Sequence, residues 1–220
     1  SQVSRYLIKK YVFLSIFLIL FSILFGQVKS FPVNSFSKEK EEKKEFYQIS
    51  SLARSTAVEI VLPQITGSGV IVEKKGKQYT ILTAWHLFED IDLEIPFKIR
   101  TDDFRTYEIN ISNIKQIDNL DMAIFTFESA KNYETAKFAN ISSLKKSDQL
   151  FSSGFADGNF YFQGGKVIAN AIANVKDGNQ LLYTSKVISG MSGGGIFDTY
   201  GKLVGINTMS TLSSFEDKSF

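Results

Sequence analysis

A serine followed by glycines is the feature of this sequence best suited to nucleophilic chemistry. The segment Ser189–Phe197 reads SGMSGGGIF, with Ser192 just before three glycines and an apolar run. A nucleophilic serine must project its hydroxyl while backbone N–H groups point at the forming oxyanion. Glycine permits the tight turn that aims those donors inward. The alternative is a flexible glycine loop or a weak anion-binding nest.

The chain has one histidine, His86, so any histidine chemistry must use it. His86 ends the motif Thr83-Ala84-Trp85-His86, just past an apolar run, and Asp121 opens another apolar run. Taken singly, the histidine fits a structural role and the aspartate fits a turn or strand start. Together with Ser192 they stand in the order His, Asp, Ser, each at an expected strand end, with gaps of 35 and 71 residues.

Composition excludes several classes of function. The chain has no cysteine and one histidine, which excludes disulfides, thiol catalysis and Cys-ligated zinc and predicts no metal and no cofactor. The glycines Gly193-Gly194-Gly195 lack the lysine and helix that a phosphate-binding loop needs. Residues 1–30 carry a charge of +4, so the remainder, with 21 basic and 23 acidic side chains, carries −2. That remainder offers no basic footprint for nucleic acid.

The N-terminal segment has the layout of a targeting signal. Arg5, Lys9 and Lys10 precede the apolar run Tyr11–Gly26. We therefore expect residues 1–30 to be a signal peptide or a membrane anchor through residues 11–26, and the sequence does not separate the two. Either would place the body outside the cytoplasm: secreted, periplasmic or anchored on the outer side of the cytoplasmic membrane. Residues 31–50, which contain the charge run Lys38–Glu45, are expected to be a charged linker.

The body, residues 51–220, is expected to be all-β. Short apolar runs alternate with turns that contain glycine, asparagine or aspartate, and several runs alternate at period two. The expected strands are Ala57–Leu62, Val70–Val72, Tyr79–Thr83, Phe97–Arg100, Tyr107–Ile111, Met122–Phe127, Gln149–Ser153, Lys166–Val175, Leu181–Thr184, Gly195–Phe197 and Lys202–Thr208.

Combined, the motifs resemble those of the trypsin-like (chymotrypsin-fold) serine peptidases. The likeness is to the compact, cysteine-free bacterial branch, such as the high-temperature-requirement type and the glutamyl endopeptidases, and it covers roughly residues 52–220. The matching motifs are Gly67-Ser68-Gly69, Thr83-Ala84-Trp85-His86, Asp121-Met122-Ala123-Ile124, Ser153-Gly154-Phe155 and Gly190-Met191-Ser192-Gly193-Gly194.

The resemblance implies a fold of two antiparallel six-stranded β-barrels with the active site between them. It implies that His86 takes the Ser192 proton, that Asp121 orients the imidazole, and that the N–H groups of Gly190 and Ser192 form the oxyanion hole. The substrate would be a protein or peptide. Asp118 is a nearby rival for the aspartate role, but it lacks the following Ala-aliphatic strand.

Three interpretations stay open at this stage. In the family, the residue six before the nucleophile lies at the base of the primary pocket. Here it is Lys186, which would favour acidic substrates or else be a surface residue. The polar stretch Thr211–Phe220 suggests that a last strand is missing and that the second barrel is open. The alternatives to a peptidase are a catalytically inactive trypsin-fold protein that binds peptides or proteins, and an unrelated membrane-anchored β-domain.

Overall fold

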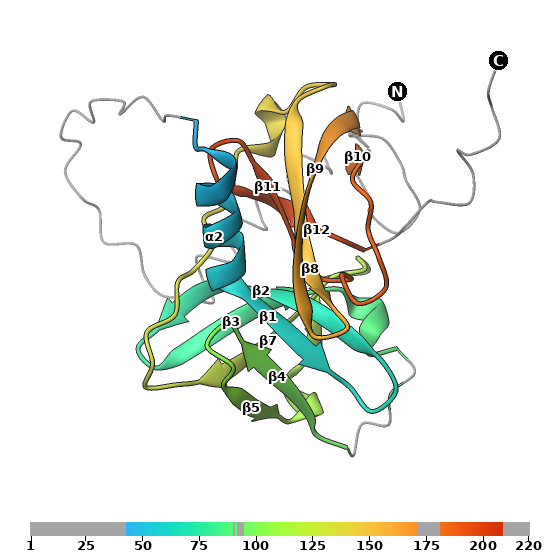
Figure 1. The fold of residues 1–220 in the computed structure, drawn as a ribbon. Coiled ribbons are helices and arrows are strands. Elements are labelled where there is room, and N and C mark those ends of the chain that lie inside the picture. Colours follow the sequence, from blue (N-terminus) through green and yellow to red (C-terminus); the bar gives the residue numbers. More distant parts are fainter. Residues whose placement is uncertain (1–42, 90, 92–94, 171–180, 209–220) are drawn as a thin grey trace, which may run out of the picture. The chain divides into compact units, whose positions relative to one another are not determined.

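Two antiparallel sheets and one helix make up the part of the chain that the structure describes (Figure 1). The structure, a computed structural model, describes residues 43–89, 91, 95–170 and 181–208, all within a unit that begins at Glu41. The predictions for residues 1–30, for most of the linker, and for the C-terminal stretch Thr211–Phe220 lie outside the described residues, as does the end of the expected strand Lys166–Val175 beyond residue 170.

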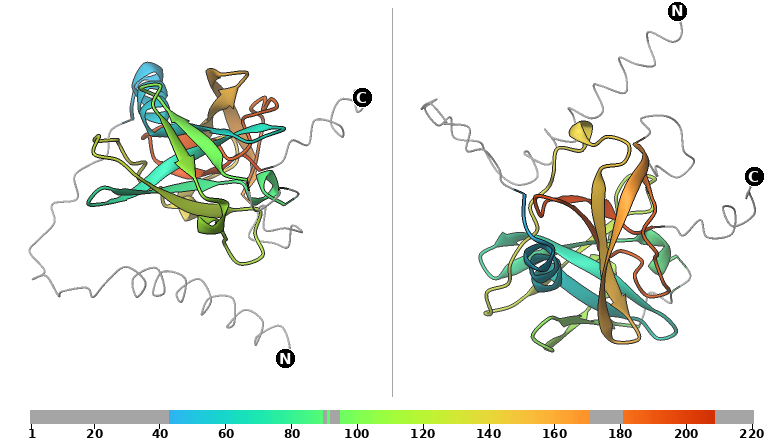
Figure 2. Two further views of the ribbon diagram at one scale, coloured as in Figure 1. Left: turned by 90° about the horizontal axis from the view of Figure 1, so that it is seen from below. Right: turned by 45° about the horizontal axis from the view of Figure 1, so that its top comes forward.

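The first sheet has seven strands in the order β5-β4-β1-β2-β3-β7-β6, and all neighbours are antiparallel. The sheet is strongly curled (Figures 1 and 2). Its apolar core includes the buried side chains of Ile60, Ile81, Phe97 and Phe125. The strands are β1 (Ala57–Val61), β2 (Thr66–Lys75), β3 (Gln78–Thr83), β4 (Phe97–Thr101), β5 (Thr106–Ile109), β6 (Lys115–Gln116) and β7 (Ala123–Glu128).

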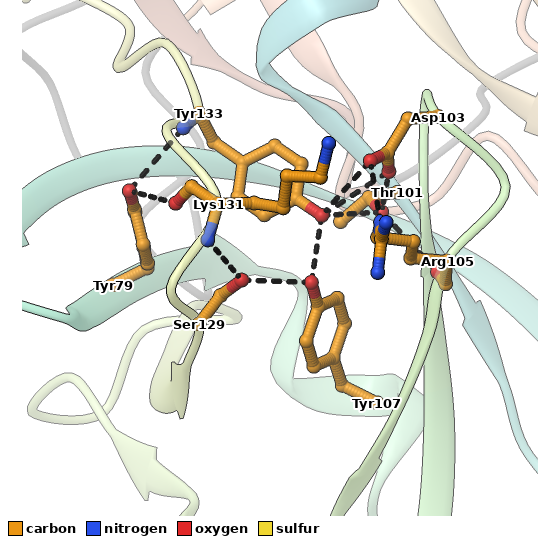
Figure 3. A network of polar contacts seen from close by, with 8 residues as sticks. All are labelled: Tyr79, Thr101, Asp103, Arg105, Tyr107, Ser129, Lys131 and Tyr133. Atoms are coloured by element: carbon orange, nitrogen blue, oxygen red, sulfur yellow. Dashed lines mark hydrogen bonds and ion pairs between the residues drawn. The ribbon is translucent and has the colours of Figure 1, made fainter.

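A polar network connects strand β5 to the segment that follows β7 (Figure 3). The hydroxyl of Tyr107 on β5 shares hydrogen bonds with Ser129 at 2.8 Å and with Tyr133 at 2.7 Å. The hydroxyl of Tyr133 also donates to Asp103 at 3.1 Å. Burial, together with its bonds to Tyr107 and Asp103, raises the pKa of Tyr133. These hydroxyl groups therefore connect parts of the curled sheet that are not direct neighbours.

The second sheet has five strands in the order β10-β9-β8-β11-β12. Strands β8 and β9 pair from Ala156↔Asn159 onward, so Asp157 and Gly158 form a two-residue hairpin turn, as the sequence predicted. The all-β prediction is confirmed, with seven and five strands among the described residues in place of six and six. The strands are β8 (Gln149–Ala156), β9 (Asn159–Asn170), β10 (Leu181–Tyr183), β11 (Gly195–Asp198) and β12 (Leu203–Ile206).

Helix α2 (Phe46–Thr56) precedes β1, where the sequence had suggested a linker up to residue 50. It begins with a capping box, in which Glu45 and Gln48 satisfy each other's backbone N–H groups. Its buried residues Ile49 and Ala53 pack into the core between the sheets, so the packed unit begins before Ser51. Within the described ranges, no helix is long and apolar enough to cross a membrane.

The core between the two sheets combines side chains from both layers and from α2. Val70 and Leu82 come from the first sheet, and Phe151, Phe197 and Leu203 come from the second. At this boundary the backbone N–H of Ser68 on β2 donates to Ser192 O at 2.7 Å, so segments of both sheets meet here. The candidate functional residues lie there.

Candidate active site

Antiparallel pairing of β3 with β7 brings His86 and Asp121 to the same edge of the first sheet. Thr83, the last residue of β3, pairs with Ala123, the first residue of β7. His86 lies three residues beyond that pair, in the short 3₁₀ turn Trp85–Leu87, and Asp121 lies two residues before it. The two side chains are therefore neighbours although 35 residues separate them in the chain.

The carboxylate of Asp121 binds His86 twice. Its Oδ1 accepts the backbone N–H of His86 at 2.8 Å, and its Oδ2 lies 2.8 Å from Nδ1 of the ring. With Nδ1 donating to an ionised carboxylate, the neutral ring has its free lone pair on Nε2, on the far side from Asp121. Asp118, the rival candidate, is exposed and has a positive φ of 49°, and it takes no part in this pair.

Asp121 also sets the pKa of the imidazole. The hydrogen bond from His86 to Asp121 raises the pKa of His86 above its usual value of 6.5. Burial acts in the opposite direction, while the negative charges of Asp121 and Glu89 add to the increase. The His86 side chain is 35% exposed and that of Asp121 15%, so the ring keeps one side open to solvent.

We expect NMR titration of this sole histidine to give a midpoint above 6.5, because Asp121 favours the protonated ring. The pKa of His86 is raised in the folded chain relative to the unfolded chain. The pair with Asp121 therefore stabilises the fold fully at pH values below the unfolded-state pKa, and this contribution is lost as pH rises through the folded-state pKa. Glu89→Gln removes one charge and should lower the midpoint. Glu134→Gln, which changes an exposed carboxylate that does not act on His86, should leave it unchanged. An equal shift in both variants would contradict this assignment.

Ser192 lies in the glycine loop, Ile188–Gly194, which leads into β11. Two of its glycines have positive φ values, 96° at Gly190 and 83° at Gly193, which a residue with a side chain rarely adopts. A Cβ atom at Gly193 would lie 2.3 Å from Thr83 Oγ1 and 2.9 Å from Ala84 N. The loop therefore packs directly on the segment that leads to His86, and this close approach requires glycine.

The peptide group between Met191 and Ser192 is held through its carbonyl. The carbonyl of Met191 accepts hydrogen bonds from Gly194 N at 2.9 Å and from Asn207 Nδ2 at 3.2 Å. In a trans peptide the C=O and N–H groups point in opposite directions. Among the described residues, neither Gly190 N–H nor Ser192 N–H donates to a protein acceptor. Both remain available as oxyanion donors.

Sequence reasoning missed Asn207, which connects the loop to the second sheet. Its Nδ2 donates to Ser153 O at 2.9 Å, and its Oδ1 accepts the hydroxyls of Ser152 and Tyr183. Its backbone O accepts Gly193 N–H at 2.7 Å. Burial raises the pKa of Tyr183 to about 12, so this donor stays protonated. The only signal in the sequence was an amide at the end of the apolar strand Leu203–Ile206.

Lys186 lies on the segment between β10 and the glycine loop and is exposed to solvent. Its expected part in substrate binding stays a prediction. Within the described ranges, no group of three or more His, Cys, Asp or Glu side chains could hold a metal ion.

Residues 67–206, from the Gly67-Ser68-Gly69 motif to the end of β12, match the family model described as the trypsin-like peptidase domain. The chain therefore belongs to the trypsin-like peptidase family, and the resemblance seen in the motifs is confirmed.

Two known proteins illustrate this similarity. The chain is 30% identical over 150 residues to a probable periplasmic serine endoprotease, DegP-like, of Buchnera aphidicola subsp. Schizaphis graminum (strain Sg). The match covers 64% of this chain but only 29% of that protein, so the chain spans less than a third of its relative's length. The crystal structure of Deg5 matches with a TM-score of 0.61 and 19% identity over 74% of this chain and 84% of Deg5, which bears on the fold alone.

Proposed function

We propose that the protein is a serine endopeptidase that hydrolyses peptide bonds through Ser192, His86 and Asp121. The observation that carries this proposal is the double hydrogen bond from His86 to Asp121, at the strand edge against which the glycine loop packs. A carboxylate that holds both the backbone and the ring of a histidine fixes the tautomer that a general base needs. The name of the Buchnera relative, a serine endoprotease, supports the same reaction.

In the proposed reaction, Ser192 Oγ attacks the carbonyl carbon of the scissile peptide while His86 Nε2 takes the hydroxyl proton. The C=O electron pair moves to the oxygen, and the N–H groups of Gly190 and Ser192 bind the oxyanion. Collapse of this intermediate breaks the C–N bond, and the protonated His86 gives its proton to the leaving amine. Water then attacks the acyl-enzyme by the same steps, releases the acid and restores Ser192.

We also propose that this reaction takes place outside the cytoplasm, on protein or peptide substrates. The support is the charged and apolar pattern of residues 1–30 and the printed name of a periplasmic relative. Cell fractionation with an antibody against the body tests this, and recovery of the native body in the cytosol would contradict it.

A fluorescent fluorophosphonate tests the proposed nucleophile without knowledge of the substrate. Ser192 Oγ would form a bond to phosphorus, fluoride would leave, and His86 would take the hydroxyl proton. We expect the wild-type chain to be labelled and Ser192→Ala to be unlabelled. Ser189→Ala, which removes an exposed serine from the same loop, should be labelled like the wild type. A folded wild-type chain that is not labelled would favour the inactive, peptide-binding alternative.

A further inference from the structure

We propose that Ser68, on strand β2, is a positioning residue that holds the oxyanion donors of the glycine loop. This inference rests on the proposed function, because it concerns how the first sheet orients groups that would act in the reaction. Ser68 is the middle residue of the Gly67-Ser68-Gly69 motif and is fully buried. It lies 122 residues before Gly190 in the chain, yet its side chain contacts the loop directly.

Every polar atom of Ser68 that faces the boundary between the sheets has a partner. Its Oγ donates to Gly190 O at 2.8 Å and accepts Phe155 N–H at 2.7 Å. Its backbone N–H donates to Ser192 O at 2.7 Å, and its carbonyl accepts the hydroxyl of Thr83 at 2.7 Å. One residue of the first sheet thus connects the glycine loop, the end of β8 and the end of β3.

The bond to Gly190 O is one of the contacts that fix the conformation of this buried glycine. Without a Cβ atom, its backbone can rotate at small steric cost, and its φ of 96° lies in a region that glycine alone adopts readily. The Ser68 hydroxyl donates to the carbonyl of the peptide between Gly190 and Met191, and Met191 N of the same peptide donates to Ile188 O at 3.0 Å. These bonds together restrict where Gly190 N–H can point.

Loss of the Ser68 hydroxyl would release this restriction. Gly190 O and Phe155 N–H would both be buried without their present partner, which favours rotation toward other partners. Rotation about Gly190 would turn its N–H away from the position of the oxyanion. The pair His86 and Asp121 makes no contact with the Ser68 hydroxyl and would be unaffected.

Ser153 provides a matched control for Ser68. Its side chain is 1% exposed, and its Oγ donates to Gly195 O at 2.8 Å, a bond of the same type and length as that of Ser68. Gly195 lies at the start of β11, beyond the glycine loop. Both variants remove a buried hydroxyl and should lower the urea midpoint of unfolding, Ser68→Ala by more because it leaves two buried groups unpaired and Ser153→Ala leaves one. Only Ser68→Ala should disturb the oxyanion donors.

The experiment compares the second-order rate constants for fluorophosphonate labelling of both variants and the wild type. We expect Ser68→Ala to react roughly 10- to 100-fold more slowly, because a misplaced oxyanion donor stabilises the transition state less. Complete loss of one donor sets the upper limit of this effect. Ser153→Ala should react within about threefold of the wild type, as expected of a group outside the site. NMR titration of His86 should give the same midpoint in all three, which separates an oxyanion effect from damage to the base.

Several outcomes would overturn the inference. If the wild type is labelled but Ser68→Ala and Ser153→Ala react at the same rate, the proposed function stands and the role of Ser68 is wrong. A shift of the His86 midpoint that accompanies the loss in Ser68→Ala would also contradict it. If the wild type is not labelled, the proposed function itself fails, and the inference fails with it. If Ser68→Ala does not fold, Ser68→Cys replaces it in the experiment, because its thiol keeps a weak hydrogen-bond donor. We expect Ser68→Cys to react more slowly than the wild type, and a wild-type rate would overturn the inference.

Discussion

Replacement of His86 by alanine is expected to lower the reactivity of Ser192 toward a fluorophosphonate by about 10⁶-fold, to below detection. A serine hydroxyl is a weak nucleophile at neutral pH, and the chain has no second histidine to take its proton. The His86 side chain is 35% exposed, so its truncation should cost little folding stability. The labelling rate, measured beside circular dichroism and a urea unfolding curve, checks both expectations.

The dependence of this reactivity on pH tests the same role in the wild type. The base must be neutral, so labelling should rise as pH increases through the raised pKa of His86. Because Asp121 raises that pKa above 6.5, the rise should fall on the alkaline side of 6.5 and coincide with the NMR midpoint. A loss below tenfold in His86→Ala, or a flat profile between about pH 5 and 8, would show that another group acts as the base.

The part of the site that the sequence predicted depends on local signals. His86 and Asp121 each stand next to an apolar strand, and antiparallel pairing of two such strands brings their opposite ends together. The positive φ values of Gly190 and Gly193 agree with the expectation that these positions require glycine. Strand boundaries differ by a few residues, as with β2, which extends over Thr66–Lys75 rather than Val70–Val72.

The roles that the sequence did not predict depend on partners far away in the chain. Ser68 and Asn207 are ordinary residue types in strand-like segments. Their roles follow from hydrogen bonds to carbonyls of the glycine loop, from Ser68 to Gly190 O, 122 residues away, and from Asn207 to Met191 O, 16 residues away. Helix α2 follows a charge run, and its fully buried apolar side chains are only those of Ile49 and Ala53. Packing into the core between the sheets identifies this helix more clearly than its sequence pattern does.

Asp121→Asn is expected to reduce the labelling rate by about 10⁴-fold, while Asp118→Asn should leave it near that of the wild type. The asparagine side chain matches the shape of aspartate, so the bond from His86 N can persist. However, its NH₂ group would favour the tautomer of His86 with the proton on Nε2, where Ser192 needs an acceptor.

Both variants replace aspartate by asparagine and remove one negative charge, and the two positions are only three residues apart. A general electrostatic effect would therefore act on both. Only Asp121 contacts the imidazole, with Oδ2 2.8 Å from Nδ1, whereas Asp118 is exposed. The His86 midpoint should also fall in Asp121→Asn, because the bond and the charge that raise its pKa are lost. If Asp118→Asn were the variant that lost labelling and shifted the midpoint, the geometry of this pair would not be the geometry of the working enzyme.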